Sequence, residues 1–216
     1  MLAEPEVALS DFALALVAGA CALSVLRGPV SDPVLRRWFA GFFATLAASA
    51  LVGGLDHGFF RGPDSRGHAI AWPLTLMLIG AAGAVVAIIA ARLSLSPRGQ
   101  RFVTGVASML WIAYAVRVLL GARDFSVAIG SYLLPAIWLL VVLLIHGFRT
   151  GKMGGFLGAS GVALILAGSA VQRFEIGLGR GWLGHNTLYH VIAAGGVILL
   201  AVGAKRLLAS GIQQTG

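Results

Sequence analysis

Seven apolar stretches fill most of this 216-residue chain, and each is long enough to cross a lipid bilayer. A helix rises about 1.5 Å per residue, so roughly 20 apolar residues span a hydrocarbon core of about 30 Å. The stretches lie near residues 8–26, 37–59, 72–92, 102–121, 126–147, 153–171 and 185–206. We therefore expect an all-α, polytopic membrane protein, with residues 1–216 forming one seven-transmembrane-helix bundle.

The composition is typical of an integral membrane protein. Apolar residues make up 58% of the chain, charged residues only 11%, and the mean hydropathy is +0.91. A soluble domain carries about twice that charged fraction. The connections between the stretches are too short to fold as separate soluble domains.

The distribution of charge predicts the orientation of the bundle. The odd-numbered connections and the C-terminus carry ten of the 16 basic residues and a single acid, Asp32. The N-terminus and the even-numbered connections, with the adjoining helix ends, carry the other six basic residues and seven acids. Basic residues favour the cytoplasmic side, so we expect the N-terminus outside and the C-terminus in the cytoplasm of an integral membrane protein, such as one of a bacterial inner or plasma membrane.

The net charge of +8 has a similar explanation. Most of it falls on one membrane face, where it meets anionic lipid headgroups, so it does not indicate nucleic-acid binding. No basic segment precedes the first apolar stretch, and we expect that stretch to direct insertion without a cleaved signal peptide.

Short local patterns predict helix starts and packing positions. Asp32-Pro33 and Trp72-Pro73 each place a proline where the first turn of a helix tolerates it. Glycines recur in the third, sixth and seventh stretches, for example at Gly161, Gly195 and Gly196. Small residues let helices approach closely in lipid, so we expect these glycines at helix contacts.

The polar and ionisable side chains that are energetically costly to place in lipid gather at one end of the predicted bundle. An ionisable side chain at bilayer depth costs several kcal/mol unless it is paired or hydrated. Those near the outer end come from the first stretch, the end of the second, the connection after it, and the start of the seventh. They are Asp11, Asp56, His57, Asp64, His68, His185, Asn186 and His190.

Three of these histidines make a candidate zinc site. Zinc binds imidazole nitrogen and carboxylate oxygen, and a catalytic zinc keeps one position for water. We therefore take His57, His185 and His190 as metal ligands, with Asp56 or Asp11 as a base or as a group that orients a ligand. The alternative is that histidines near the interface bond only to water or backbone, and that Asp11 compensates a helix dipole.

Helical geometry sharpens the choice among them. His185 and His190 lie ~140° apart around an ideal helix, which is poor for binding one ion, unless His185 precedes the first helical turn. Asn186 and His190 are four residues apart and share a face. Asp56 and His57 point ~100° apart, so at most one of them aims squarely into a shared site.

The seven stretches and two of these motifs resemble the CREST superfamily, which includes alkaline ceramidases and the progestin and adiponectin receptor family. Where that family has Ser-x3-His in the second span, this chain has Gly53-x3-His57, and where it has His-x3-His in the seventh, this chain has Asn186-x3-His190. The resemblance implies zinc held by His57 and His190, with Asn186 in the third place and His185 beside it. It also implies hydrolysis of a lipid amide or ester, and an acid near the third span, for which Asp64 is the nearest candidate.

Two functions therefore remain open from the sequence. One is a zinc-dependent hydrolase of lipid amides or esters at the outer leaflet. The other is a non-enzymatic membrane protein that binds a lipid or small molecule, or serves as an assembly component. Transport is less favoured, since the chain shows no inverted repeat and no pair of broken helices in matching halves. The oligomeric state does not follow from these patterns.

Overall fold

Seven long helices run through the described part of the chain, residues 2–28, 30–62, 65–179 and 184–209 of a computed structural model. They are α1 (Pro5–Arg27), α2 (Pro33–Leu55), α3 (Arg66–Ser94), α4 (Pro97–Leu119), α5 (Phe125–Thr150), α6 (Met153–Arg173) and α7 (His185–Ala209), with a π-helical turn, η1 (Asp56–Phe60), that continues α2. Each is long and apolar enough to cross a membrane. The expected all-α, seven-helix membrane protein is confirmed.

The start of α2 follows the pattern read from the sequence. The Asp32 carboxylate accepts hydrogen bonds from the backbone N–H groups of Val34 and Leu35, and Pro33 occupies the first helical position. The same carboxylate binds the Arg92 guanidinium, with Oδ2 3.1 Å from Nε, and so ties α2 to the end of α3.

The start of α3 differs from the expectation. The Trp72-Pro73 pattern was the wrong start, because the Ser65 side chain caps the helix by accepting from the N–H of His68, and α3 begins at Arg66. Pro73 therefore lies inside the helix. The carbonyl that Pro73 leaves without a donor belongs to Ala69, which is exposed near the helix start, so the cost of the missing bond is small.

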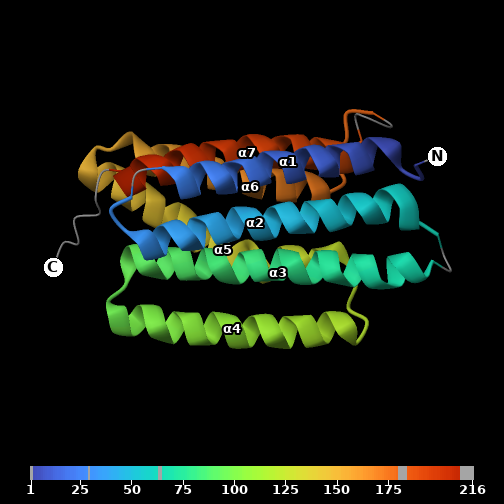
Figure 1. The fold of residues 1–216 in the computed structure, drawn as a ribbon, viewed down its shortest axis with the longest axis horizontal. Helices are drawn as coiled ribbons and strands as arrows, with labels where there is room; N and C mark the ends of the chain where they lie inside the picture. The colour runs from blue at the N-terminus through green and yellow to red at the C-terminus, as the bar shows by residue number, and fades with distance from the viewer. Residues whose placement is uncertain (1, 29, 63–64, 180–183, 210–216) are drawn as a thin grey trace.

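Six of the helices form a closed ring, and α4 lies outside it. Neighbouring contacts run from α1 to α2, α3, α5, α6 and α7 and back to α1, whereas α4 packs against α3. Figure 1 shows α4 along one edge of the bundle and α1 with α7 at the opposite edge. The interior of this ring is the place where a site shielded from lipid can form.

Glycines set the close approach of α6 and α7. A Cβ atom added at Gly196 would lie 2.7 Å from the carbonyl oxygen of Gly161, and one added at Gly203 would lie 2.4 Å from the amide nitrogen of Gly158. Backbone therefore rests on backbone along this pair. Gly195, expected at a contact as well, has nothing within 4 Å of such an atom.

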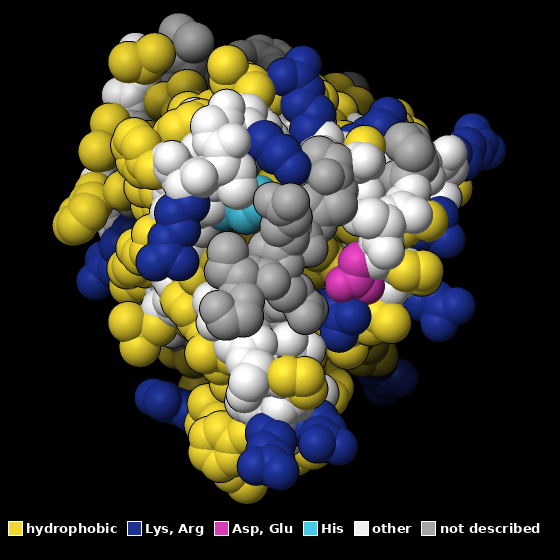
Figure 2. Space-filling view, turned by 90° about the vertical axis from the view of Figure 1, so that its left-hand side faces the viewer, with side chains coloured by type: hydrophobic (Ala, Val, Ile, Leu, Met, Phe, Trp, Pro, Cys, Tyr) yellow, Lys and Arg dark blue, Asp and Glu magenta, His cyan; other side chains and the backbone are white. Residues whose placement is uncertain are grey.

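The two ends of the ring differ in charge. The N-terminus and the end of α7 lie at opposite ends of the bundle (Figure 1). Figure 2 looks onto the end where α7 finishes, and Lys and Arg side chains are spread around it with little acidic surface. The end where the chain begins holds His57, His68, His185 and His190 and most of the acids discussed below, so we call it the N-terminal end.

Candidate functional site

A cavity of about 260 Å3 lies inside the ring at the N-terminal end. Five of the residues singled out in the sequence line it, and they come from α1, η1 and α7. These are Asp11, His57, His185, Asn186 and His190. Helices that are far apart in the chain therefore bring these five side chains to one hollow.

Asp11 and His190 form a direct pair across α1 and α7. Asp11 Oδ1 lies 3.1 Å from His190 Nε2, and both residues are buried. The neighbouring Ser10 hydroxyl donates to the Val7 carbonyl at 2.8 Å and lies 2.8 Å from His190 Nδ1. Ser10 has a single hydroxyl hydrogen, so His190 Nδ1 is the donor to Ser10 where that hydrogen is on Val7, and the acceptor where it is turned to the ring.

That hydrogen-bond pattern requires one proton between Asp11 and His190. A neutral imidazole that carries its proton on Nδ1 has a lone pair on Nε2, which faces a carboxylate oxygen here. Two acceptors at hydrogen-bond distance need a proton between them. The pair is therefore a neutral acid with a neutral imidazole or a carboxylate with an imidazolium in this tautomer, and a carboxylate beside Nε2–H of a neutral imidazole in the other.

His57 reaches the same cavity from the π-helical turn and is held from behind by Glu4. The His57 Nδ1 atom lies 2.5 Å from Glu4 Oε2, and the Arg61 Nε–H donates to Glu4 Oε1 at 3.3 Å. Partial burial alone raises the pKa of Glu4, but the hydrogen bond with His57 and the charge of Arg61 outweigh it and leave the pKa below its ordinary value. With Nδ1 engaged, Nε2 is the ring nitrogen of His57 left for a ligand.

The segment that carries Glu4 is tied to η1 by its backbone. The N–H of Ala3 donates to the carbonyl of Gly58, and the N–H of Glu4 donates to the carbonyl of His57. π-Helical turns occur often at functional sites because they re-aim side chains. Here the turn and the N-terminal segment together fix the position of His57.

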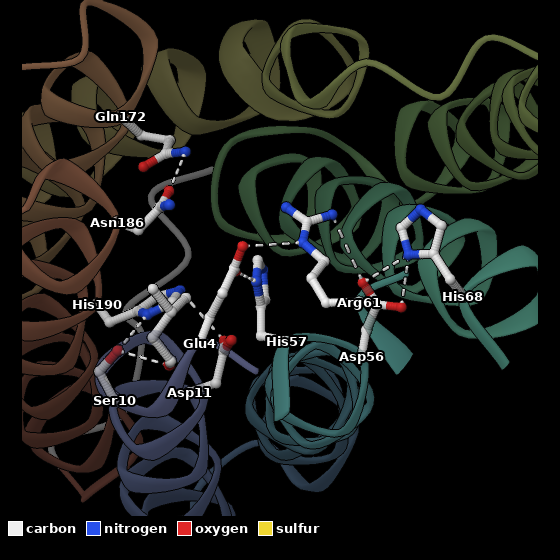
Figure 3. A network of polar contacts seen from close by, with 11 residues as sticks. Glu4, Ser10, Asp11, Asp56, His57, Arg61, His68, Gln172, Asn186 and His190 are labelled. Carbon is white, nitrogen blue, oxygen red and sulfur yellow. Dashed lines mark hydrogen bonds and ion pairs between the residues drawn. The ribbon is translucent and has the colours of Figure 1, made fainter. Parts of the chain in front are cut away.

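Asp56 points away from the cavity and forms a second, separate pair. It is fully buried, its carboxylate oxygens lie 2.8 and 3.0 Å from His68 Nδ1, and Oδ2 lies 3.9 Å from a terminal nitrogen of Arg61. Neither Asp56 nor His68 lines the cavity. Figure 3 shows Asp56 turned toward His68 and His57 turned toward Glu4, so only His57 faces the cavity. Asp64 lies outside the described residues.

Aromatic side chains form one wall of the cavity. The Trp72 ring stacks on His68 with centroids 6.4 Å apart, meets the His57 ring edge-on at 6.2 Å, and donates from Nε1 to the Arg123 carbonyl. Phe125 and Tyr189 continue the wall toward His190. Trp72, which the sequence pattern placed only at a helix start, is thus part of the site.

Two amides close the side of the cavity nearest α6. Gln172 Nε2 donates to Asn186 Oδ1 at 2.7 Å, and both residues line the cavity (Figure 3). Gln172 Oε1 and Asp11 Oδ2 are buried and have no hydrogen-bond partner among the described residues. Two acceptors on one cavity are therefore left without a donor or a cation.

Several of these residues were not singled out from the sequence. The site also uses Ser10, Arg61 and Gln172, together with Glu4 and the aromatic wall. Ser10 and Gln172 had a usable signal, since each is a polar residue at the polar end of an apolar stretch. Glu4 had none, because only the fold carries the chain's first residues back onto η1.

One family model matches almost the whole bundle. Residues 7–209 match the model described as "Family of unknown function (DUF6962)". The chain belongs to this family. The match runs from the first turn of α1 to the end of α7, so the helical ring and the Asp11, His57 and His190 positions of this DUF6962 protein all fall within it. No curated protein and no solved structure matches the chain.

Proposed function

We propose that this DUF6962 protein is a zinc-dependent hydrolase of lipid amides or esters, with its site in the cavity at the N-terminal end. The observation that carries the proposal is the state of the two imidazoles. Nδ1 of His57 is held by Glu4, and Nδ1 of His190 is held by Ser10, which leaves Nε2 of each ring for the cavity they share. Histidine ligands of zinc are oriented in this way by a partner on the second nitrogen.

Asp11 is the third ligand that fits best. Its Oδ1 already lies 3.1 Å from His190 Nε2, which is close to the separation of two ligands on one zinc ion, and its Oδ2 is buried without a partner. A cation at this point would replace the proton that Asp11 and His190 share. His185 lines the same cavity and is the alternative third ligand.

The remaining side chains supply binding and orientation. A bound zinc would supply a water ionised near neutral pH. Glu4 and Ser10 fix the two imidazole rings, and Gln172 with Asn186 offers amide groups to a polar head. A small apolar cavity of about 60 Å3 adjoins the site and shares Leu46, Ile79 and Tyr189 with it, so a ligand with an apolar tail suits the pair of hollows.

Zinc analysis of the protein purified in detergent without chelator tests this proposal. We expect about one equivalent of zinc per chain, and its loss in His57→Ala, His190→Ala and Asp11→Ala. Release of fatty acid from lipid amides or esters should fall with the metal. The control His146→Ala removes a histidine outside the cavity and should keep both zinc and activity.

A metal-free ligand-binding protein is the second candidate, and one observation favours it. Within the described residues, no three His, Cys, Asp or Glu side chains stand together as a metal group, so the zinc ligands would have to close by side-chain rotation. The Asp11–His190 pair is complete with a proton alone. Less than about a tenth of an equivalent of zinc, with stability unchanged by chelator, would reject the hydrolase and favour this candidate.

A further inference from the structure

A second hollow lies at the opposite end of the bundle from the cavity just described. It has a volume of about 550 Å3 and sits between α1 and α7 where both helices carry basic residues. Its lining consists of Ala20, Leu23, Ser24, Arg27, Gly28 and Lys205. The zinc proposal makes no use of any of these residues.

The lining changes from apolar to cationic along α1. Residues 20, 23, 24 and 27 follow the spacing of one helix face. Ala20 and Leu23 lie deeper in the span and are exposed, so they face lipid chains. Ser24 and Arg27 lie at the helix end, where headgroups begin. The hollow therefore presents an apolar part and a polar part in the order of a phospholipid.

The polar part is positively charged and has no acid of its own. Lys205 reaches from α7 and donates from Nζ to Ser24 Oγ at 2.9 Å, and Arg27 is exposed at the rim. Neither cation has a carboxylate partner among the described residues. The acid in the connection that follows α1, Asp32, is engaged by Arg92 through Oδ1 at 3.0 Å.

We propose that this hollow binds one anionic glycerophospholipid, with its phosphate on Arg27, Lys205 and Ser24 and an acyl chain on Leu23 and Ala20. A guanidinium and an ammonium beside a hydroxyl supply the donors that phosphate oxygens accept. Basic pockets between transmembrane helices on the cytoplasmic side suit anionic headgroups, and the charge distribution predicts that side here. The apolar part favours a lipid over free phosphate.

Native mass spectrometry of the detergent-solubilised protein tests the site. Phosphatidylglycerol and phosphatidylcholine with identical acyl chains would be added in parallel, with inorganic phosphate as a third arm. We expect one retained phosphatidylglycerol, about tenfold weaker retention in the Arg27→Gln/Lys205→Gln variant, and full retention in Arg98→Gln/Arg101→Gln. The control pair removes two exposed cations from the same end of the bundle, outside the hollow.

Three results would overturn the proposal. Equal weakening in both double variants would show diffuse attraction to a basic surface. Equal retention of phosphatidylcholine would show that the hollow does not select for negative charge. Inorganic phosphate binding as tightly as the lipid would show that the acyl chain does not contribute to binding. If the Arg27→Gln/Lys205→Gln protein fails to fold, Ala20→Trp provides the test. This variant fills the lipid-facing part of the hollow from an exposed position, so it must weaken retention of phosphatidylglycerol. Unchanged retention would overturn the proposal.

Discussion

A single shared proton organises the residues at the centre of the site. Ser10 contacts His190 Nδ1, and in either tautomer of the ring one proton lies between His190 and Asp11. Buried polar atoms without partners cost about 1–3 kcal/mol each, so this chain of contacts is strongly coupled. The same atoms that hold the proton are those that could hold a cation.

We expect Asp11→Asn to be tolerated better than Asp11→Leu. The amide of Asn can donate to the lone pair on His190 Nε2, whereas Leu leaves that nitrogen buried without a partner, which costs about 1–3 kcal/mol of stability. Thermal unfolding of the purified protein in detergent measures the difference. An Asn variant as unstable as the Leu variant would contradict the contact between Asp11 and His190.

Glu4 gives the N-terminal segment a dependence on pH. Its pKa is lowered in the folded protein, so the stability it contributes is present above its unfolded pKa of about 4.3 and is lost as the pH falls through the lower folded value. We expect wild type to lose more thermal stability than Glu4→Gln between about pH 6 and pH 3. Parallel profiles of thermal stability against pH for wild type and Glu4→Gln would contradict this. The control is Glu6→Gln, whose profile should follow wild type. Glu6 is a carboxylate without an ion-pair partner among the described residues.

At the scale of elements, two features shape the bundle. One is the π-helical turn at the end of α2, and the other is the close backbone contact between α6 and α7. The π-helical turn at the end of α2 separates Asp56 from His57 and gives each its own partner. The α6–α7 pair depends on glycines, which leave no room for a Cβ at Gly161, Gly196 or Gly203. Close packing of this kind replaces the hydrophobic drive that is absent within lipid.

Two adjacent glycines on α7 provide a matched pair of substitutions. Gly196→Ala places a methyl group 2.7 Å from the Gly161 carbonyl and should destabilise the protein by about 1–3 kcal/mol. Gly195→Ala meets nothing within 4 Å and should be neutral or stabilising, since Ala favours the helix by up to about 1 kcal/mol. Equal thermal stability of the two variants would show that α6 and α7 do not pack in this way.

At the scale of the whole molecule, the six-helix ring separates two chemically different ends. The N-terminal end holds the paired carboxylates and histidines, and the other end holds most of the basic residues. α4 stands outside the ring, so it contributes neither to the cavity between the helices nor to the hollow between α1 and α7.

The basic asymmetry predicts that the cavity opens toward the outside of the cell. A green fluorescent protein fused after residue 216 should fluoresce, because the predicted C-terminus is cytoplasmic. A periplasmic phosphatase fused at the same position should be inactive. A dark fluorescent fusion with an active phosphatase fusion would reverse the orientation and place the site on the cytoplasmic side.

The sequence by itself determined the number and type of helices and the end at which the polar residues lie. Length and apolar composition decide that much, because lipid forces each apolar stretch of this length into a helix. That Asp56 and His57 cannot both face one site also follows from their being neighbours on a helix. The start of α3 did not, because a serine cap outweighed the proline pattern.

Only the tertiary structure decided which polar residues meet. Asp11 reaches His190 because the ring closes α1 against α7, nearly the whole chain apart, and no local pattern encodes that contact. Glu4 reaches His57 because the first residues fold back onto η1. Asp56 meets His68 because the start of α3 packs beside η1. Local spacing fixes which way a side chain points along its own helix, whereas its partner is chosen by the packing of the whole ring.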